Sequence, residues 1–94
     1  MSALDDVASE CRRHAEEGWT PEHDDTHRSG EMARAAGCYA LLAGGIDPPM
    51  ARAWPWSREW WKPGDARRML VKAAALIVAE IERLDRASGR VGRS

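Results

Sequence analysis

The sequence predicts an all-α fold in which a helical hairpin is joined to a third long helix by an irregular connector rich in tryptophan and proline. Three observations predict this fold. Apolar residues recur at helical spacing in three separate segments, glycine or proline ends each segment, and no stretch shows the apolar–polar alternation of a half-buried strand. Because the chain has 94 residues, we expect a single domain over 1–94.

The first helix is expected over residues 2–17. Its apolar stripe consists of Leu4, Val7, Cys11 and His14, which share one helical face. Ser2 is a suitable N-cap, and the acidic residues of the first turn suit the positive end of the helix dipole. Gly18 ends the pattern, so we expect the chain to turn there toward a second helix.

The second helix is expected over residues 22–43. Thr20 followed by Pro21 has the order of an N-cap and a first helical residue, and a later start at Asp25 also fits the pattern. The apolar stripe then consists of Met32, Ala35, Ala36, Tyr39 and Leu42. Two glycines and two prolines follow and end the helix. Its many small residues permit close approach of a neighbouring helix.

The connector, residues 46–64, contains four of the five tryptophans and four of the five prolines. The prolines prevent a regular helix, apart from a short turn expected at about 57–61 that Ser57 can cap. The chain has no phenylalanine and one tyrosine, so tryptophan has to supply much of the bulk of the core. We therefore expect Trp19 and Trp54 in the core.

The third helix is expected over residues 65–87, with Asp65 as its N-cap and a frayed tail over 89–94 behind it. The stripe expected to be buried consists of Leu70, Ala73, Ala74, Ile77, Ile81 and Leu84. Further apolar residues lie outside this stripe, at Met69, Val71, Leu76 and Val78. A chain of this size does not cover so much apolar surface alone, so we expect a homo-oligomer, by frequency a dimer.

Composition and charge argue against several classes of protein. The chain is 44% hydrophobic and 31% charged, as globular proteins are, and it lacks the roughly 18 consecutive apolar residues of a membrane span. Its acidic N-terminus is unlike a signal peptide, so we expect a cytoplasmic protein. Residues 1–31 carry a net charge of −6 and residues 32–94 a net charge of +5. This split argues against general nucleic-acid binding and allows a local anion site in the second half.

A group of tryptophans and arginines, in the connector and at the start of the third helix, forms the first candidate site. Indole rings offer flat faces for stacking, arginine binds phosphate through two N–H groups at once, and a helix N-terminus favours an anion. The combination suits a nucleotide-like anion. The residues expected to contact it are Trp56, Trp60, Arg52, Arg58, Arg67 and Arg68. The alternatives are that the tryptophans only fill the core, or that they form a protein-binding face.

Histidines and carboxylates at the start of the second helix form a second candidate site. On one helix His23, His27 and Glu31 stand at i, i+4 and i+8, and a hairpin would bring His14, and Glu10 with it, to the same region. The spacing suits a divalent metal and, with it, a small metal-dependent hydrolase. The alternative is a solvated helix N-terminus in which His14 bonds a nearby aspartate. No catalytic triad or phosphate-binding loop is present, so we expect neither catalysis nor another cofactor.

Most of the chain is covered by three blocks: GWTPEHDDTHRSGEMARAAGCYALL, WPWSREWWKP and RRMLVKAAALIVAEIERLDR. Together they resemble a widespread group of small phage and prophage proteins to which no chemistry is assigned. The resemblance implies a location in the cytoplasm of a bacterial host and a role against host defence. We therefore expect a non-catalytic protein that sequesters a nucleotide-like immune signal. The alternatives are the metal-dependent hydrolase and a module that binds a host protein.

Overall fold

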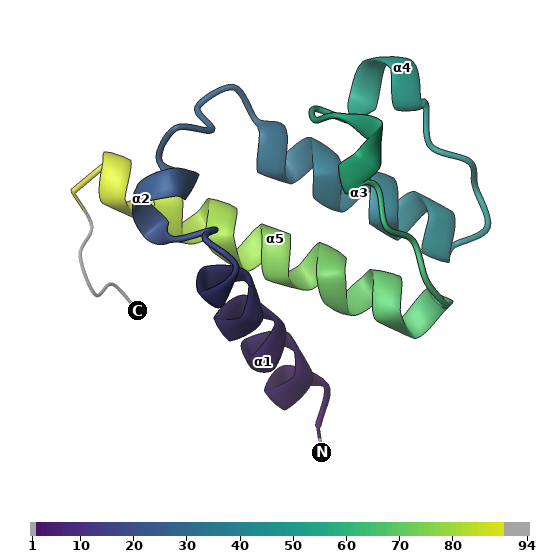
Figure 1. Cartoon of the computed structure of the whole chain (residues 1–94), viewed down its shortest axis with the longest axis horizontal. Coiled ribbons are helices and arrows are strands. Elements are labelled where there is room, and N and C mark those ends of the chain that lie inside the picture. Colours follow the sequence, from purple (N-terminus) through teal and green to yellow (C-terminus); the bar gives the residue numbers. More distant parts are fainter. Residues whose placement is uncertain (1, 90–94) are drawn as a thin grey trace.

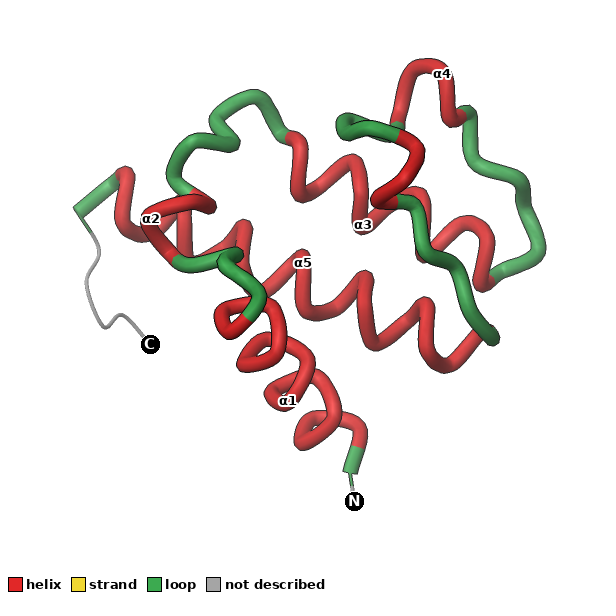
Figure 2. The backbone as a smooth tube through the Cα atoms, in the orientation of Figure 1, coloured by secondary structure: helices red, strands yellow, loops and turns green. Residues whose placement is uncertain are grey.

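The computed structural model describes residues 2–89, and over this range the protein is all-α, as the sequence predicts. Three long helices form its frame: α1 (Ala3–Glu16), α3 (Glu31–Ala43) and α5 (Ala66–Ala87). Two single-turn helices and a 3₁₀ turn lie between them: α2 (Pro21–Asp24), α4 (Met50–Ala53) and η1 (Arg58–Trp60). Helices α3 and α5 lie side by side along their lengths, whereas α1 meets α5 at an angle (Figure 1; Figure 2).

Helix α1 begins where the sequence predicts but packs differently. Ser2 Oγ accepts a hydrogen bond from the Asp5 N–H at 3.0 Å, and the Asp5 carboxylate accepts one from the Ser2 N–H at 3.3 Å. The predicted apolar stripe is wrong at its first member, because Leu4 is 82% exposed. The buried residue of α1 is Glu10. Ion pairs of Asp6 and Glu10 with Arg67 and Arg68 therefore join this helix to α5.

The predicted helix over 22–43 is wrong in its continuity, because it is divided into α2 and α3. Thr20 caps α2 as predicted, with its Oγ1 accepting a hydrogen bond from the His23 N–H at 3.2 Å. Thr26 Oγ1 then donates to the His23 carbonyl at 2.7 Å, which offers the backbone an alternative to a further helical turn. Gly30 has a φ of 79°, a left-handed conformation that a continuous helix excludes. Helix α3 therefore starts later than either predicted position.

The core lies between α3 and α5 and beneath the connector. It consists of Ala35, Ala36, Cys38, Tyr39, Trp54, Met69 and Ala73. The small side chains of α3 let α5 approach closely, and the rings of Trp54 and Tyr39 add bulk through an edge-to-face contact at 5.7 Å. The prediction that Trp54 is a core residue is confirmed. Trp19 is only half-buried.

The connector folds against α3 and contains α4, which the sequence did not predict (Figure 1). The predicted short turn is present as η1, but its cap differs. Trp54 Nε1 donates to the Ser57 carbonyl at 3.1 Å, and the Ser57 side chain makes no capping bond within the described residues. Trp61 stacks on Tyr39 with ring centroids 4.7 Å apart, and Tyr39 Oη accepts a hydrogen bond from the Lys62 N–H at 3.2 Å. Ring packing and two hydrogen bonds thus hold a proline-rich segment in place.

Helix α5 forms over nearly the predicted residues, and the Asp65 carboxylate accepts a hydrogen bond from the Arg68 N–H at 2.8 Å. The prediction of its buried stripe is confirmed for Ala73 and wrong for the large residues of the stripe. Leu70, Ile77, Ile81 and Leu84 are each about half exposed. The buried residues of this helix are Met69, Val71, Ala73, Ala75 and Arg83. The reason is that α3 and α1 pack on the two flanks of α5 and leave the stripe between those flanks uncovered.

The predicted frayed tail, residues 89–94, lies outside the described residues apart from Gly89. Within residues 2–89, no helix has the length and the apolar character that crossing a membrane requires.

Candidate functional site

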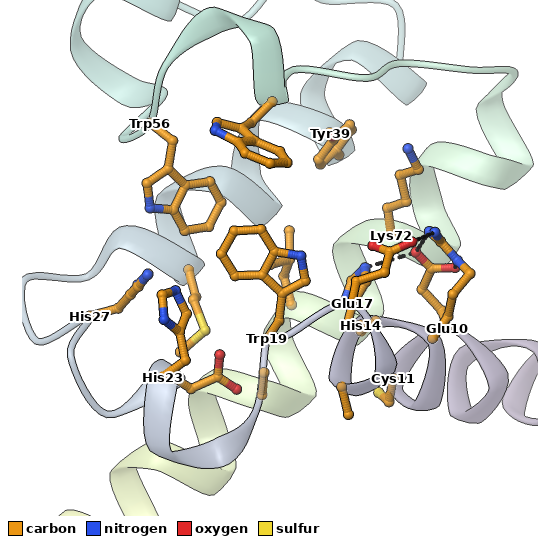
Figure 3. Close-up of a pocket in the computed structure, with 18 of the residues that line it drawn as sticks. Glu10, Cys11, His14, Glu17, Trp19, His23, His27, Tyr39, Trp56 and Lys72 are labelled. Atoms are coloured by element: carbon orange, nitrogen blue, oxygen red, sulfur yellow. Dashed lines mark hydrogen bonds and ion pairs between the residues drawn. The ribbon is translucent and has the colours of Figure 1, made fainter.

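A cavity of about 760 Å³, here called the aromatic pocket, lies among α1, α2, the connector and α5 (Figure 3). One side of it is formed by the rings of Trp19, Tyr39, Trp54, Trp56 and Trp60. The other side is formed by charged residues of α1 and α5, and the three histidines His14, His23 and His27 also line the cavity. Figure 3 shows Trp19 in the middle, between Trp56 with His27 on one side and Glu10 with Lys72 on the other.

The aromatic side is held by a continuous series of ring contacts. Trp60 meets Trp19 edge to face with ring centroids 5.4 Å apart, and Trp19 meets His23 at 4.9 Å. His23 lies 5.0 Å from His27, which meets Trp56 edge to face at 5.3 Å. Edge-to-face pairs contribute roughly 0.5–1.5 kcal/mol beyond their buried area. The series therefore fixes the relative positions of rings from three parts of the chain.

His27 is buried in this aromatic wall, and its side chain makes no hydrogen bond within the described residues. The residue is 9% exposed, and neither Nδ1 nor Nε2 is bonded to another residue in the described part of the chain. The turn between α2 and α3 positions it, since its N–H donates to the Asp24 carbonyl at 3.0 Å. Leaving a buried polar group unpaired costs about 1–3 kcal/mol. A group held at that cost beside a cavity is a candidate for contact with a ligand.

Glu10 organises the charged side of the pocket. It is 3% exposed, and its Oε2 lies 2.5 Å from Arg13 Nη2 and 2.8 Å from His14 Nε2, while its Oε1 lies 2.8 Å from Arg68 Nη1. Burial by itself would raise the pKa of Glu10, but hydrogen bonds from Arg13 and Arg68 outweigh burial and lower the pKa from 4.5 to about 2. Burial lowers the pKa of His14. Glu10 thus engages both arginines on this side of the pocket.

Lys72 is a second basic group on this side, with different partners. Its Nζ donates to the Lys62 carbonyl at 2.7 Å and lies 5.5 Å from the centroid of the Tyr39 ring. Burial, followed by repulsion from Arg68, lowers the pKa of Lys72. Because an ammonium group has three N–H donors, Lys72 can bond an anionic group of a ligand and keep its bond to the carbonyl. Near the histidines, burial raises the pKa of Asp24.

The structure brings some of the ligand residues expected from the sequence to the pocket. Those that line it are Trp56, Trp60 and Arg68. Those that do not line it are Arg52, Arg58 and Arg67. Arg67 pairs with Asp6 of α1 at 2.6 Å, and Arg52 and Arg58 are exposed on the connector. Consecutive helical residues point about 100° apart, and of Arg67 and Arg68 only Arg68 is directed to the aromatic pocket.

The division of the predicted helix also separates the candidate metal ligands. His14, His23 and His27 line the pocket, whereas Glu31 does not, and its carboxylate accepts a hydrogen bond from the N–H two residues before it at 2.7 Å. His14 lies against Glu10 rather than against an aspartate. No group of three or more His, Cys, Asp and Glu side chains placed to hold a metal occurs between residues 2 and 89. The shared helical face on which the metal prediction depended is therefore not formed.

The sequence prediction underestimates three residues of the pocket. It omits Lys72, which no motif marks, although it lies one helical turn after Arg68. It includes Glu10 only as an additional metal ligand, although Arg13 and His14 at i+3 and i+4 are a signal for an ion-paired face. It places Trp19 in the core, and the half-buried ring instead lines the pocket (Figure 3).

Comparison with known proteins finds no relative from which a function could be carried over. No family model matches the chain, and no curated protein or solved structure matches it significantly. The function is therefore inferred from the geometry of the pocket.

Proposed function

We propose that the protein binds a small nucleotide-like molecule in the aromatic pocket and holds it without transforming it. The observation that supports this proposal most strongly is a cavity of about 760 Å³ walled by tryptophan rings, with the unpaired imidazole of His27 among them. Pockets for small molecules typically measure about 300–1,000 Å³ and combine apolar or aromatic walls with a few polar groups. The aromatic pocket has this size and this composition.

The tryptophan rings provide the attraction for a flat base. Stacking of a base on an aromatic side chain contributes roughly 1–3 kcal/mol. Trp60 is 46% exposed and contacts Trp19, so its ring is accessible to an incoming ligand. Trp56 is less exposed and contacts His27. A base among these rings would bring its edge toward His27, whose imidazole has one nitrogen that donates and one that accepts a hydrogen bond when neutral.

The charges of the pocket favour a ligand with few negative charges. Four acidic and four basic residues line it: Glu10, Glu17, Asp24, Glu82, Arg13, Lys62, Arg68 and Lys72. Arg13 and Arg68 are paired with Glu10, so Arg68 is less suited to phosphate than its position in the sequence suggests. Lys72 is the better phosphate contact, because its partner is a carbonyl group. A mononucleotide suits this distribution better than a polyanion does.

Sequestration is the role that we propose for this binding. Glu10 is engaged in ion pairs with Arg13 and His14, and the rings of His23 and His27 contact each other, which suits holding a ligand. Together with the resemblance to small phage proteins, the pocket supports an anti-defence protein that removes a nucleotide immune signal from the cytoplasm of a bacterial host.

Titration calorimetry with a panel of nucleosides, mononucleotides, cyclic dinucleotides and ADP-ribose tests the proposal. We expect saturable binding of a compound of the mononucleotide class, recovered chemically unchanged afterwards. The Trp60→Ala variant should bind it roughly 5–150-fold more weakly, since it loses about 1–3 kcal/mol of stacking. Arg58→Ala is the matched control, because Arg58 is near in sequence and does not line the pocket. Absence of binding across the panel, or equal affinity of the Trp60→Ala variant, would contradict the proposal.

A further inference from the structure

Helix α5 carries a row of apolar side chains whose large members the described chain leaves exposed. The row consists of Leu70, Ala74, Ile77, Ile81 and Leu84, and its larger members are 53%, 48%, 52% and 51% exposed. Its spacing of four, three, four and three residues is the heptad spacing of a helix that packs along another helix. Helical geometry places this row opposite Lys72 and Ala79, which line the aromatic pocket. The row and the pocket are therefore on opposite sides of α5.

Four other apolar residues of α5 are already covered within the chain. Met69, Val71, Ala73 and Ala75 are buried, and α3 and α1 supply the neighbouring helices. A helix that is apolar on two sides is normally covered on both. Four large apolar side chains in one continuous row exceed the single exposed apolar residues that protein surfaces commonly show. This row therefore indicates an interface with another molecule.

We propose that the row packs against the same row of a second copy of this chain, with the two α5 helices antiparallel. In this arrangement Ile77 lies on the twofold axis and meets its own equivalent. Leu70 then lies opposite Leu84 of the other copy, and Ala74 lies opposite Ile81, so a small residue faces a large one. The row is thus complementary to itself when reversed, as an isologous interface requires.

The charges beside the row favour the antiparallel direction. Arg67 and Asp85 lie on the same edge of the row, one near each end of α5. Reversal brings Arg67 of one copy within about one helical turn of Asp85 of the other, and symmetry repeats the pairing at the other end. If the two helices were parallel, Arg67 would instead lie beside Arg67 of the other copy, and Asp85 beside Asp85. Arg67 also bonds Asp6 at 2.6 Å, and its guanidinium has donors for a second carboxylate.

The size of the row sets the expected strength of the dimer. A helix of 22 residues is about 33 Å long, and a helix surface strip is roughly 10 Å wide. Two such strips bury less area than the roughly 1,200–2,000 Å² of tight complexes. We therefore expect a reversible dimer with a dissociation constant on the order of micromolar, independent of any ligand in the pocket.

Sedimentation equilibrium of the full chain tests the dimer. The wild type should approach twice its monomer mass of 10.4 kDa as its concentration rises through the micromolar range. Ile77→Glu should raise the dissociation constant by at least about 100-fold, because it places like charges face to face. Ile46→Glu is the matched control, since Ile46 is 59% exposed, lies between α3 and α4 and is not part of the row on α5, so this variant should leave the dimer intact. Leu84→Glu repeats the test at another position, and circular dichroism checks that each variant stays helical.

The direction of the helices is tested by charge exchange. Leu70→Glu alone and Leu84→Lys alone should each dissociate the dimer, while the double variant should restore it, because opposite charges then face each other only in the antiparallel pair. A monomeric wild type at about 100 µM, or a dimer that survives Ile77→Glu, would overturn the proposed interface. A double variant that remains monomeric while wild type is dimeric would overturn the antiparallel arrangement.

Discussion

At the scale of single residues, two buried polar side chains define the two sides of the aromatic pocket in opposite ways. Glu10 is surrounded by Arg13, His14 and Arg68 within 2.8 Å, so its charge is compensated. His27 lies among aromatic rings and has no bonded side-chain nitrogen among the described residues. We therefore expect Glu10 to stabilise the fold, and His27 to reduce the stability of the fold while contributing to ligand binding.

The stability of the fold should depend on the ionisation of Glu10. Its pKa falls from 4.5 in an unperturbed setting to about 2 in the folded protein, so ionisation contributes about 3 kcal/mol to the free energy of unfolding at neutral pH. This contribution is fully present above about pH 4.5 and is lost as the pH falls through about 2. Urea unfolding at pH 7 should show that Glu10→Gln is less stable by about 3 kcal/mol, and the difference should shrink at pH 3.

The matched control for Glu10 is Glu17→Gln. Glu17 pairs with Arg13 at 2.6 Å, but both side chains are nearly half exposed, so its loss should cost less than about 1 kcal/mol. If the two variants lose the same stability at pH 7, the interpretation of the Glu10 cluster is wrong.

Replacing His27 by an apolar residue should separate stability from binding. In His27→Leu the buried, unpaired imidazole is removed, so the free energy of unfolding should stay equal or rise by up to about 1–3 kcal/mol. Binding of the ligand identified by calorimetry should weaken at least about tenfold, through loss of one hydrogen bond. A variant that loses more than about 1 kcal/mol of stability, with unchanged affinity, would show that His27 serves the fold instead.

At the scale of secondary structure, the sequence predicts the long helices well and their interruptions and faces less well. Ser2, Thr20 and Asp65 cap helices as their side chains predict, because capping is local chemistry. The sequence does not predict the break before α3, since the apolar spacing begins only at Met32 and the left-handed conformation of Gly30 is revealed only by the fold. The exposed face of α5 was missed too, because helical spacing identifies an apolar stripe without saying which molecule covers it.

Two glycines provide a direct test of the break between α2 and α3. Gly30 has a φ of 79°, so Gly30→Ala should destabilise the protein by about 1–2 kcal/mol through backbone strain. A Cβ at this position meets Arg34 Nη1 only at 3.4 Å, so a clash does not account for the loss. Gly37 lies inside α3 with open space where a Cβ would stand, so Gly37→Ala should stabilise by about 0.4–1 kcal/mol.

Thermal unfolding of both variants measures this difference. A Gly30→Ala variant as stable as Gly37→Ala would mean that the two helices join into the continuous helix predicted from the sequence.

At the scale of the whole molecule, the pocket depends on segments that are distant in the chain. The sequence identifies the tryptophan-rich connector, yet it cannot show that Trp19, Trp56 and Lys72 share one cavity, because their meeting depends on tertiary packing. Charge patterning misleads in the same way. In the sequence Arg68 resembles a phosphate contact, but the structure pairs it with Glu10, which lies 58 residues earlier in the chain. The sequence thus predicts which types of residue the pocket contains, but it does not predict which residues contact one another.

The dependence on several segments implies that the ligand stabilises the fold. A ligand that binds only the folded state at 100 times its dissociation constant raises the free energy of unfolding by about 2.7 kcal/mol. The melting temperature of the wild type should therefore rise with ligand concentration, and that of Trp60→Ala should rise much less at the same concentration. An equal rise in both proteins would place the ligand outside the aromatic pocket.

The central claim is that a ligand occupies the aromatic pocket, and the indole N–H signals of the five tryptophans test it most directly. In ¹⁵N-labelled protein, addition of the nucleotide should shift the signals of Trp19, Trp56 and Trp60, which line the pocket, with one common dissociation constant. The signal of Trp61, which packs on Tyr39 and does not line the pocket, should change little. Shifts that are absent for all five tryptophans, or that are as large for Trp61 as for Trp19, would contradict the account.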